Sequence, residues 1–221
     1  MVKRAKTRLP APDYVAALIH DMKNLLGATA GNIAFAREQL GEARDDCGEA
    51  LEDADDALRR IGALADELLT VSQYEAGTLF VSAEPLRVRE VLDAVARNMD
   101  REVSMRETSV AVLSPDELDC TADRGLVSQA LESMIGWFVR QASRGAAVEL
   151  HALETDTEIE LVVVRRLTSP LDEIPRALYV AECIAMAHGG ALDASDRGGA
   201  AAVVLRLPKV YSTGTRLPVI R

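Results

Sequence analysis

A histidine, an acid and an amide stand close together near the start of the chain, in the run IHDMKNLL over residues 19–26. Asp21 follows His20 directly, and Asn24 comes four residues after the histidine. A neutral imidazole is a good nucleophile near pH 7. A histidine that points into water beside a carboxylate is therefore a candidate for nucleophilic chemistry, provided that the surrounding structure keeps it at the surface.

A long helix is predicted to hold His20 in that position. Steps of three and four separate the apolar residues around it, which is the pattern of a helix that packs along its length on other helices. These residues are Val15, Leu18, Met22, Leu25, Thr29, Ile33, Ala36 and Leu40. His20 is two residues from both Leu18 and Met22, so it is expected to point away from this seam. We expect the helix to span residues 12–40, with Asn24 on the same outer face as the histidine.

A second helix with the same three-and-four spacing follows an acidic stretch. Its apolar residues are Leu51, Ala54, Leu58, Ile61, Ala65, Leu68 and Val71. It is expected to end near Ala76-Gly77, because glycine suits the left-handed C-terminal position. The acidic residues 42–56 are interpreted as a turn and the solvated face of this helix; the alternative is a rim that repels wrong partners. Two such helices form an antiparallel hairpin that cannot cover both of its seams, which predicts a homodimer built as a four-helix bundle.

The periodicity changes after residues 78–85, an extended stretch that we interpret as a domain boundary. Beyond it, helices are predicted over residues 88–101, 126–142 and 177–188, and strands over residues 109–113, 118–120, 148–152, 159–163 and 200–207. Helices mixed with mostly hairpin-linked strands indicate a two-layer α/β sandwich. The chain is thus predicted to be an α+β protein in four parts: a flexible arm (1–11), the helical hairpin (12–77), the sandwich (78–208) and a tail (209–221).

The composition argues against several classes of partner. A formal net charge of −10 and a pI near 4.9 argue against nucleic acid or an anionic membrane as the main partner. No apolar run reaches the roughly 18 residues that cross a bilayer. The basic start of the chain has no apolar core behind it, so no signal peptide is predicted. Cys47, Cys120 and Cys183 lack metal-ligand spacing and are interpreted as reduced thiols of a cytoplasmic protein, with no metal site.

Three segments, in order, resemble the core of bacterial sensor histidine kinases. Residues 20–26 resemble the family's phospho-accepting box, in which His is followed by Glu or Asp. Residues 61–77 resemble the end of its second helix, and the run MAHGG over residues 186–190 resembles the helix end that follows its nucleotide lid. The resemblance covers residues 14–208. It implies a hairpin for dimerisation and phosphotransfer, followed by an ATP-binding lobe.

The lobe departs from the family at each nucleotide-binding element. Ser133 and Trp137 stand where the family has two Asn residues, four apart, that hold Mg²⁺ and nucleotide. Residues 165–170 replace an Asp-x-Gly-x-Gly box and contain no glycine, and residues 176–180 lack the second glycine box, which cradles phosphates. The loop between these boxes is also short for an ATP lid. We conclude from the sequence that the lobe keeps the fold and has lost ATP binding.

The resemblance then implies a phosphotransferase rather than a kinase. His20 would take a phosphoryl group from a phospho-aspartate of one receiver domain and pass it to another. Asp21 would accept a hydrogen bond from the other ring nitrogen and fix the tautomer, and Asn24 holds the position that places water for receiver dephosphorylation. Lys23 is either a phosphate contact or a plain surface lysine. The receiver would supply Mg²⁺, so the chain needs no cofactor.

Two other functions stay open at this point. One is a non-catalytic dimeric adaptor that binds and sequesters receivers or kinases, and the other is a divergent ATP-dependent histidine kinase. For the remaining singled-out residues we predict structural roles. His188 is expected to be a cation partner at a helix C-terminus, His151 an exposed strand residue, and Trp137 a core filler.

Overall fold

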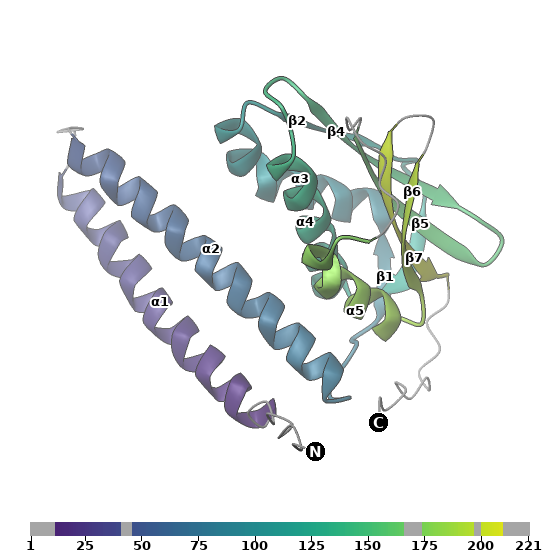
Figure 1. Cartoon of the computed structure of the whole chain (residues 1–221), viewed down its shortest axis with the longest axis horizontal. Coiled ribbons are helices and arrows are strands. Elements are labelled where there is room, and N and C mark those ends of the chain that lie inside the picture. Colours follow the sequence, from purple (N-terminus) through teal and green to yellow (C-terminus); the bar gives the residue numbers. More distant parts are fainter. Residues whose placement is uncertain (1–11, 41–45, 166–173, 197–199, 210–221) are drawn as a thin grey trace, which may run out of the picture. The chain divides into compact units, whose positions relative to one another are not determined.

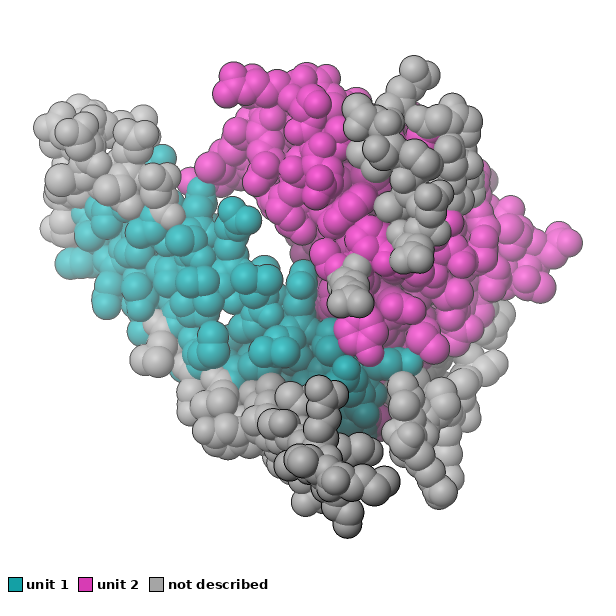
Figure 2. Space-filling view, viewed as in Figure 1, with its two compact units in different colours: residues 1–76 teal, residues 77–221 magenta. Residues whose placement is uncertain are grey.

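The computed structural model describes residues 12–40, 46–165, 174–196 and 200–209 (Figure 1). The chain divides into two compact units, residues 1–76 and 77–221, which are coloured separately in Figure 2. None of the helices within the described ranges has the combination of length and hydropathy that a membrane span requires.

The first unit is an antiparallel pair of long helices, α1 (Pro12–Leu40) and α2 (Asp46–Glu75) (Figure 1). Two ion pairs cross between the helices, Lys23 with Asp66 and Arg37 with Glu52. Lys23 and Arg37 are 14 residues apart, about four turns, and so are Glu52 and Asp66. The two pairs therefore fix one register along the hairpin.

The predicted seam of α1 omits Ile19, which the structure buries. Met22 was placed on it, yet its side chain is 45% exposed, whereas Ile19 is only 1% exposed. Two helices in contact bury little more than the line along which they touch. The seam was predicted to be covered by a second copy as well, so the exposure of Met22 in one chain does not decide whether it lies on the seam. His20 follows Ile19 and is exposed, as predicted.

A single hairpin buries only one side of the predicted seam of α2. Ala65 is buried, but Ile61 and Leu68 are 41% and 53% exposed, and Leu64 is 63% exposed. Ile61, Leu64 and Leu68 follow one another in three-four steps and form a second apolar stripe, which we call the outer stripe of α2. The hairpin by itself leaves this stripe in contact with water.

The second unit is a two-layer sandwich in which helices cover one face of a mixed sheet (Figure 1). The strand order is β2-β4-β5-β7-β6; β2 is parallel to β4 and the other pairs are antiparallel. Two further strands, β1 and β3, pair separately. The strands are β1 (Glu84–Arg87), β2 (Ser109–Leu113), β3 (Asp119–Ala122), β4 (Ala147–Glu154), β5 (Glu158–Arg165), β6 (Ala191–Asp196) and β7 (Ala201–Pro208). The helices are α3 (Val88–Met105), α4 (Arg124–Arg140), the 3₁₀ turn η1 (Arg176–Leu178) and α5 (Tyr179–Ala187).

The sequence did not predict β1 or β6. β1 begins within the stretch interpreted as a boundary and pairs with β3. β6 has the sequence ALDASD, in which few residues favour strands, and it gains its order by pairing with β7 at the edge of the sheet. The central strands β5 and β7 are buried on both faces, because Val162, Ala202 and Val204 are also buried on the face away from the helices.

Candidate functional site

The candidate nucleophile lies on the exposed side of α1. His20 forms a contact of 3.2 Å between its Nδ1 atom and the Nδ2 atom of Asn24, one turn along the same helix. An amide can present either its donor or its acceptor to the same position, so Asn24 is able to serve either tautomer of the ring. The structure thus brings together His20 and Asn24 as the sequence predicted, with Nδ1 as the nitrogen that faces the amide.

Asp21 belongs to α1, but its side chain lies outside the described part of the structure. The predicted hydrogen bond from the ring of His20 to Asp21 therefore stays a prediction.

Lys23 is engaged with the other helix of the hairpin. Its Nζ atom donates to Oδ1 of Asp66 on α2, and the two side chains are 44% and 47% exposed. The sequence had singled out Lys23 but not Asp66. The signal that could have found Asp66 is the hairpin register, because Glu52 and Asp66 are spaced along α2 as Arg37 and Lys23 are along α1.

The cysteines and acidic groups of the described ranges make no metal centre. Among those residues, no group of three His, Cys, Asp or Glu side chains could hold a metal ion. Burial, with the Asp119 carboxylate as a smaller contribution, raises the pKa of the Cys120 thiol to about 11. Cys183 is buried as well. Cys120 is thus a protonated, unreactive thiol at neutral pH.

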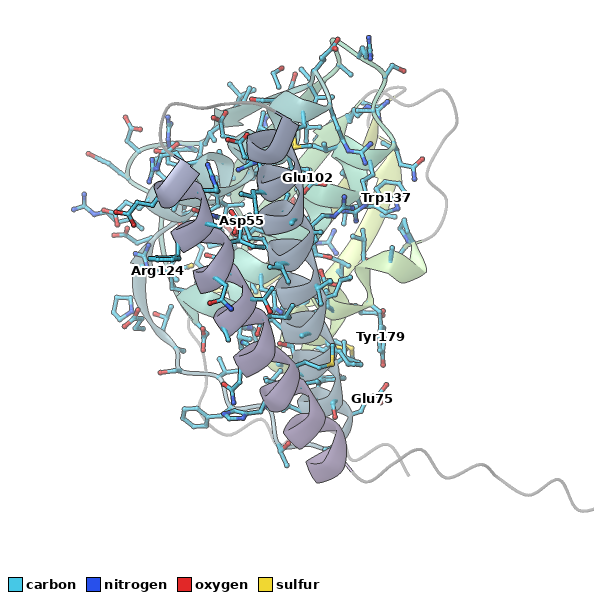
Figure 3. All side chains as sticks on the ribbon, turned by 90° about the vertical axis from the view of Figure 1, so that its left-hand side faces the viewer. Asp55, Glu75, Glu102, Arg124, Trp137 and Tyr179 are labelled. Carbon is cyan, nitrogen blue, oxygen red and sulfur yellow. The ribbon has the colours of Figure 1, made fainter. Side chains whose placement is uncertain are left out.

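Helix α4 carries the two positions at which the lobe departs from the nucleotide-binding pattern. Ser133 is buried, and Trp137 is half-buried with its ring edge-on to that of Phe138 at a centroid distance of 4.9 Å (Trp137 is labelled in Figure 3). The predicted role of Trp137 as a core filler holds only in part, since Phe138 is the ring that is fully buried. Neither a serine nor an indole offers the amide oxygen that would ligate Mg²⁺.

A buried arginine lies at the C-terminal end of the same helix. Arg165, the last residue of β5, is 8% exposed, and its Nη1 atom donates to the carbonyl oxygen of Phe138 at 3.1 Å. Its Nε atom has no hydrogen-bond partner within the described ranges. Burial lowers the pKa of the Arg165 guanidinium. A cation here complements the negative end of the α4 dipole and satisfies a carbonyl of the last helical turn.

His188 caps the C-terminal end of α5, as predicted, but it is not the cation that was expected there. The ring is 2% exposed. Its Nε2 accepts a hydrogen bond from the backbone N–H of Asp123 at 3.0 Å, and its Nδ1–H donates to the carbonyl of Ile184 at 2.8 Å. Burial lowers the pKa of His188, against smaller opposing effects of the Ile184 carbonyl and the Asp123 carboxylate. The ring is therefore a neutral imidazole that joins the end of α5 to the start of α4.

Asp123, whose backbone N–H donates to that ring, is the N-cap of α4. Its Oδ1 accepts from the backbone N–H of Leu126 at 3.0 Å and its Oδ2 from that of Ser82 at 2.9 Å. The remaining histidine, His151, is only half-exposed on β4 and lies 2.9 Å from Glu149, so the predicted exposed position is correct in part.

No family model and no curated protein sequence matches this chain, but solved structures do. The Acinetobacter baumannii histidine kinase AdeS superposes with a TM-score of 0.61 at 16% identity, over 82% of this chain and 96% of that one. The chain has the fold of a histidine kinase core. Full-length ShkA in complex with AMPPNP gives a TM-score of 0.66 at 18% identity, over 91% of this chain and 47% of that one.

A third structure of this fold contains a partner. Histidine kinase ThkA, solved in complex with the response regulator protein TrrA, gives a TM-score of 0.54 at 13% identity, over 89% of this chain and 61% of ThkA. At such low sequence identities, the three superpositions establish the fold of the chain alone. The expectation of an α+β chain with N-terminal helices and a mixed-sheet domain is thereby confirmed.

Proposed function

We propose that this chain is a homodimeric histidine phosphotransferase of a bacterial phosphorelay, which works in the cytoplasm and passes a phosphoryl group between receiver aspartates through His20, without ATP. The observation that carries the proposal is the exposed imidazole on α1, whose Nδ1 faces Asn24, within a histidine kinase core fold. The complex of ThkA with a response regulator supports receivers as the class of partner.

In the proposed transfer step the attacking atom is Nε2 of His20, because Nδ1 faces the amide of Asn24. The Nε2 lone pair attacks the phosphorus of the receiver's aspartyl phosphate and forms an N–P bond. The P–O bond to the receiver breaks, its electron pair leaves on the aspartate carboxylate, and Nδ1 keeps its proton. Asp21 accepts a hydrogen bond from that N–H and stabilises the positive charge of the phosphorylated ring, while the amide of Asn24 lies beside Nδ1. The reverse sequence delivers the group to a second receiver, which supplies its own Mg²⁺.

The lobe supports a function without ATP. Trp137 takes the place of a metal-binding amide, and the end of β5 carries a buried cation, Arg165, where the family has an adenine-reading carboxylate. A guanidinium bonded to the Phe138 carbonyl cannot accept the hydrogen bond that such a carboxylate takes from the adenine amino group.

The proposal is tested by mixing the protein with receiver domains that carry labelled aspartyl phosphate. We expect acid-labile, alkali-stable label on the wild-type chain and at least a 100-fold lower transfer rate for His20→Gln. The matched control is His151→Gln, which removes a partly exposed histidine of the lobe and is expected to leave labelling unchanged. Equal label on wild type and His20→Gln, or no label with every receiver tried, would contradict the proposal.

Two binding measurements separate the alternatives. Titration calorimetry is expected to show no micromolar affinity for ATP; such an affinity would favour a divergent kinase instead. A receiver that binds the chain tightly, with no label passing to His20, would favour a non-catalytic adaptor.

A further inference from the structure

We propose that Lys23 is a phosphorylation-dependent switch: it binds Asp66 of α2 when His20 is unmodified, and it releases Asp66 to bind the phosphoryl group when His20 carries one. This inference rests on the proposed function. It adds a positioning role for Asp66 and a link between the phosphorylated helix and its neighbour.

The geometry brings both anions within reach of one flexible cation. Lys23 lies three residues after His20 on α1, a spacing that places side chains next to each other on a helix, with Cβ atoms about 5–6 Å apart. Its ammonium group now donates across the hairpin to the Asp66 carboxylate. Both members of the pair are nearly half exposed, so the lysine can turn without first leaving a packed core.

The charges decide which partner the lysine prefers. The Asp66 carboxylate carries one negative charge, whereas a phosphoryl group on His20 carries close to two and three acceptor oxygens. Phosphorylation of His20 therefore favours exchange of Lys23 from α2 to the phosphoryl group, while the pair of Arg37 with Glu52, four turns away, stays in place.

The competition between Asp66 and the phosphoryl group for Lys23 predicts the direction in which each substitution shifts the transfer equilibrium. Asp66 withdraws Lys23 from the phosphoryl group, so Asp66 lowers the stability of phospho-His20 relative to the phospho-receiver. Removing the Asp66 charge releases Lys23 to the phosphoryl group and shifts the transfer equilibrium toward phospho-His20. Removing Lys23 shifts it the other way.

The test is a double-mutant cycle on the equilibrium ratio of phospho-His20 to phospho-receiver. Asp66→Asn is expected to raise this ratio about threefold, and Lys23→Gln to lower it by a similar factor. In the Lys23→Gln background, Asp66→Asn is expected to have no effect. The matched control is Glu52→Gln, which breaks the other interhelical ion pair, of similar exposure, and is expected to leave the ratio unchanged. The ratio is an equilibrium quantity, so slower docking of the receiver does not alter it.

Three results would overturn the switch: Asp66→Asn matches Glu52→Gln, Asp66→Asn lowers the ratio, or its effect persists without Lys23. In each of these cases wild-type His20 is labelled and the proposed phosphotransfer stands. Absence of label on the wild type with every receiver tried would overturn both proposals together.

Discussion

The interhelical ion pairs of the hairpin and the buried cation and imidazole of the lobe lie in opposite surroundings. In the hairpin, the interhelical pairs of Lys23 with Asp66 and Arg37 with Glu52 lie at the surface with both members partly exposed. In the lobe, His188 and Arg165 are buried, and each bonds to the backbone at one end of α4. Surface pairs exchange partners at little cost, whereas a buried donor or acceptor that loses its partner costs about 1–3 kcal/mol. The hairpin is therefore suited to change during a reaction, and the lobe to hold its shape.

The two units also differ in how far they shield their apolar side chains from water. Phe35 of α1 is 64% exposed and the outer stripe of α2 is open, whereas Phe138 of α4 is fully buried. Two helices touch along one line only, while a sheet and three helices enclose a volume. The comparison teaches that the lobe encloses a core within one chain, although Phe80 at its start is 81% exposed, whereas the hairpin encloses almost none, which is what the proposed dimer expects.

The largest expected effect contrasts these two phenylalanines. Phe138→Ala leaves a cavity in a closed core and is expected to destabilise the lobe by about 3–5 kcal/mol. Phe35→Ala removes a ring of the hairpin that the lobe does not enclose, and it is expected to change the stability of the lobe by at most about 0.5 kcal/mol. Urea unfolding followed by the fluorescence of Trp137, the single tryptophan of the chain, reports on the lobe, and circular dichroism reports on the helices. Similar losses for both variants would show that the contrast between the units is wrong.

A charged residue introduced into the outer stripe of α2 tests whether a second copy of the chain covers the hairpin. Leu64→Glu is expected to convert the proposed homodimer to a monomer, because burial of an unpaired carboxylate and loss of leucine contacts together cost about 2 kcal/mol or more per protomer. Light scattering at micromolar concentration measures the mass. The matched control is Leu113→Glu, which charges a leucine of the lobe that is also exposed, by 51%, and is expected to keep the dimer mass. A wild-type chain with the mass of a monomer would refute the bundle.

The smallest expected effect is a pH dependence that belongs to the lobe. Because burial lowers the pKa of His188, the folded chain binds fewer protons there than the unfolded chain, whose histidine titrates near pH 6.5. The stabilising contribution is therefore present above about pH 6.5 and is lost as the pH falls through the folded pKa. Between pH 7 and pH 5, the wild type is expected to lose more stability than His188→Gln.

Urea unfolding monitored through Trp137 measures this difference. His151→Gln is the control and is expected to keep the wild-type pH dependence, since His151 lies at the surface of β4 beside Glu149. If His188→Gln keeps the wild-type dependence of unfolding free energy on pH, then the buried ring plays no part in that dependence.

The sequence alone determined the features that depend on local pattern. The three-four spacing of apolar residues predicted α1 over residues 12–40, and alternation predicted that Val148, Leu150 and Ala152 face the core of the lobe. The exposure of His20 also follows from helical geometry, because a spacing of two residues from Leu18 and Met22 turns it roughly 160° away from both. Such features need only the chain's own periodicity.

Tertiary structure decided everything that depends on which faces meet. It buried Ile19 and left Met22 exposed within one chain, paired Lys23 with Asp66, and ordered β6 by its bonds to β7. It also turned His188 from an expected cation into a buried neutral ring that accepts from Asp123. Protonation and partner choice depend on burial and on groups far away in the chain, and neither of these is encoded in the spacing of residues along one element.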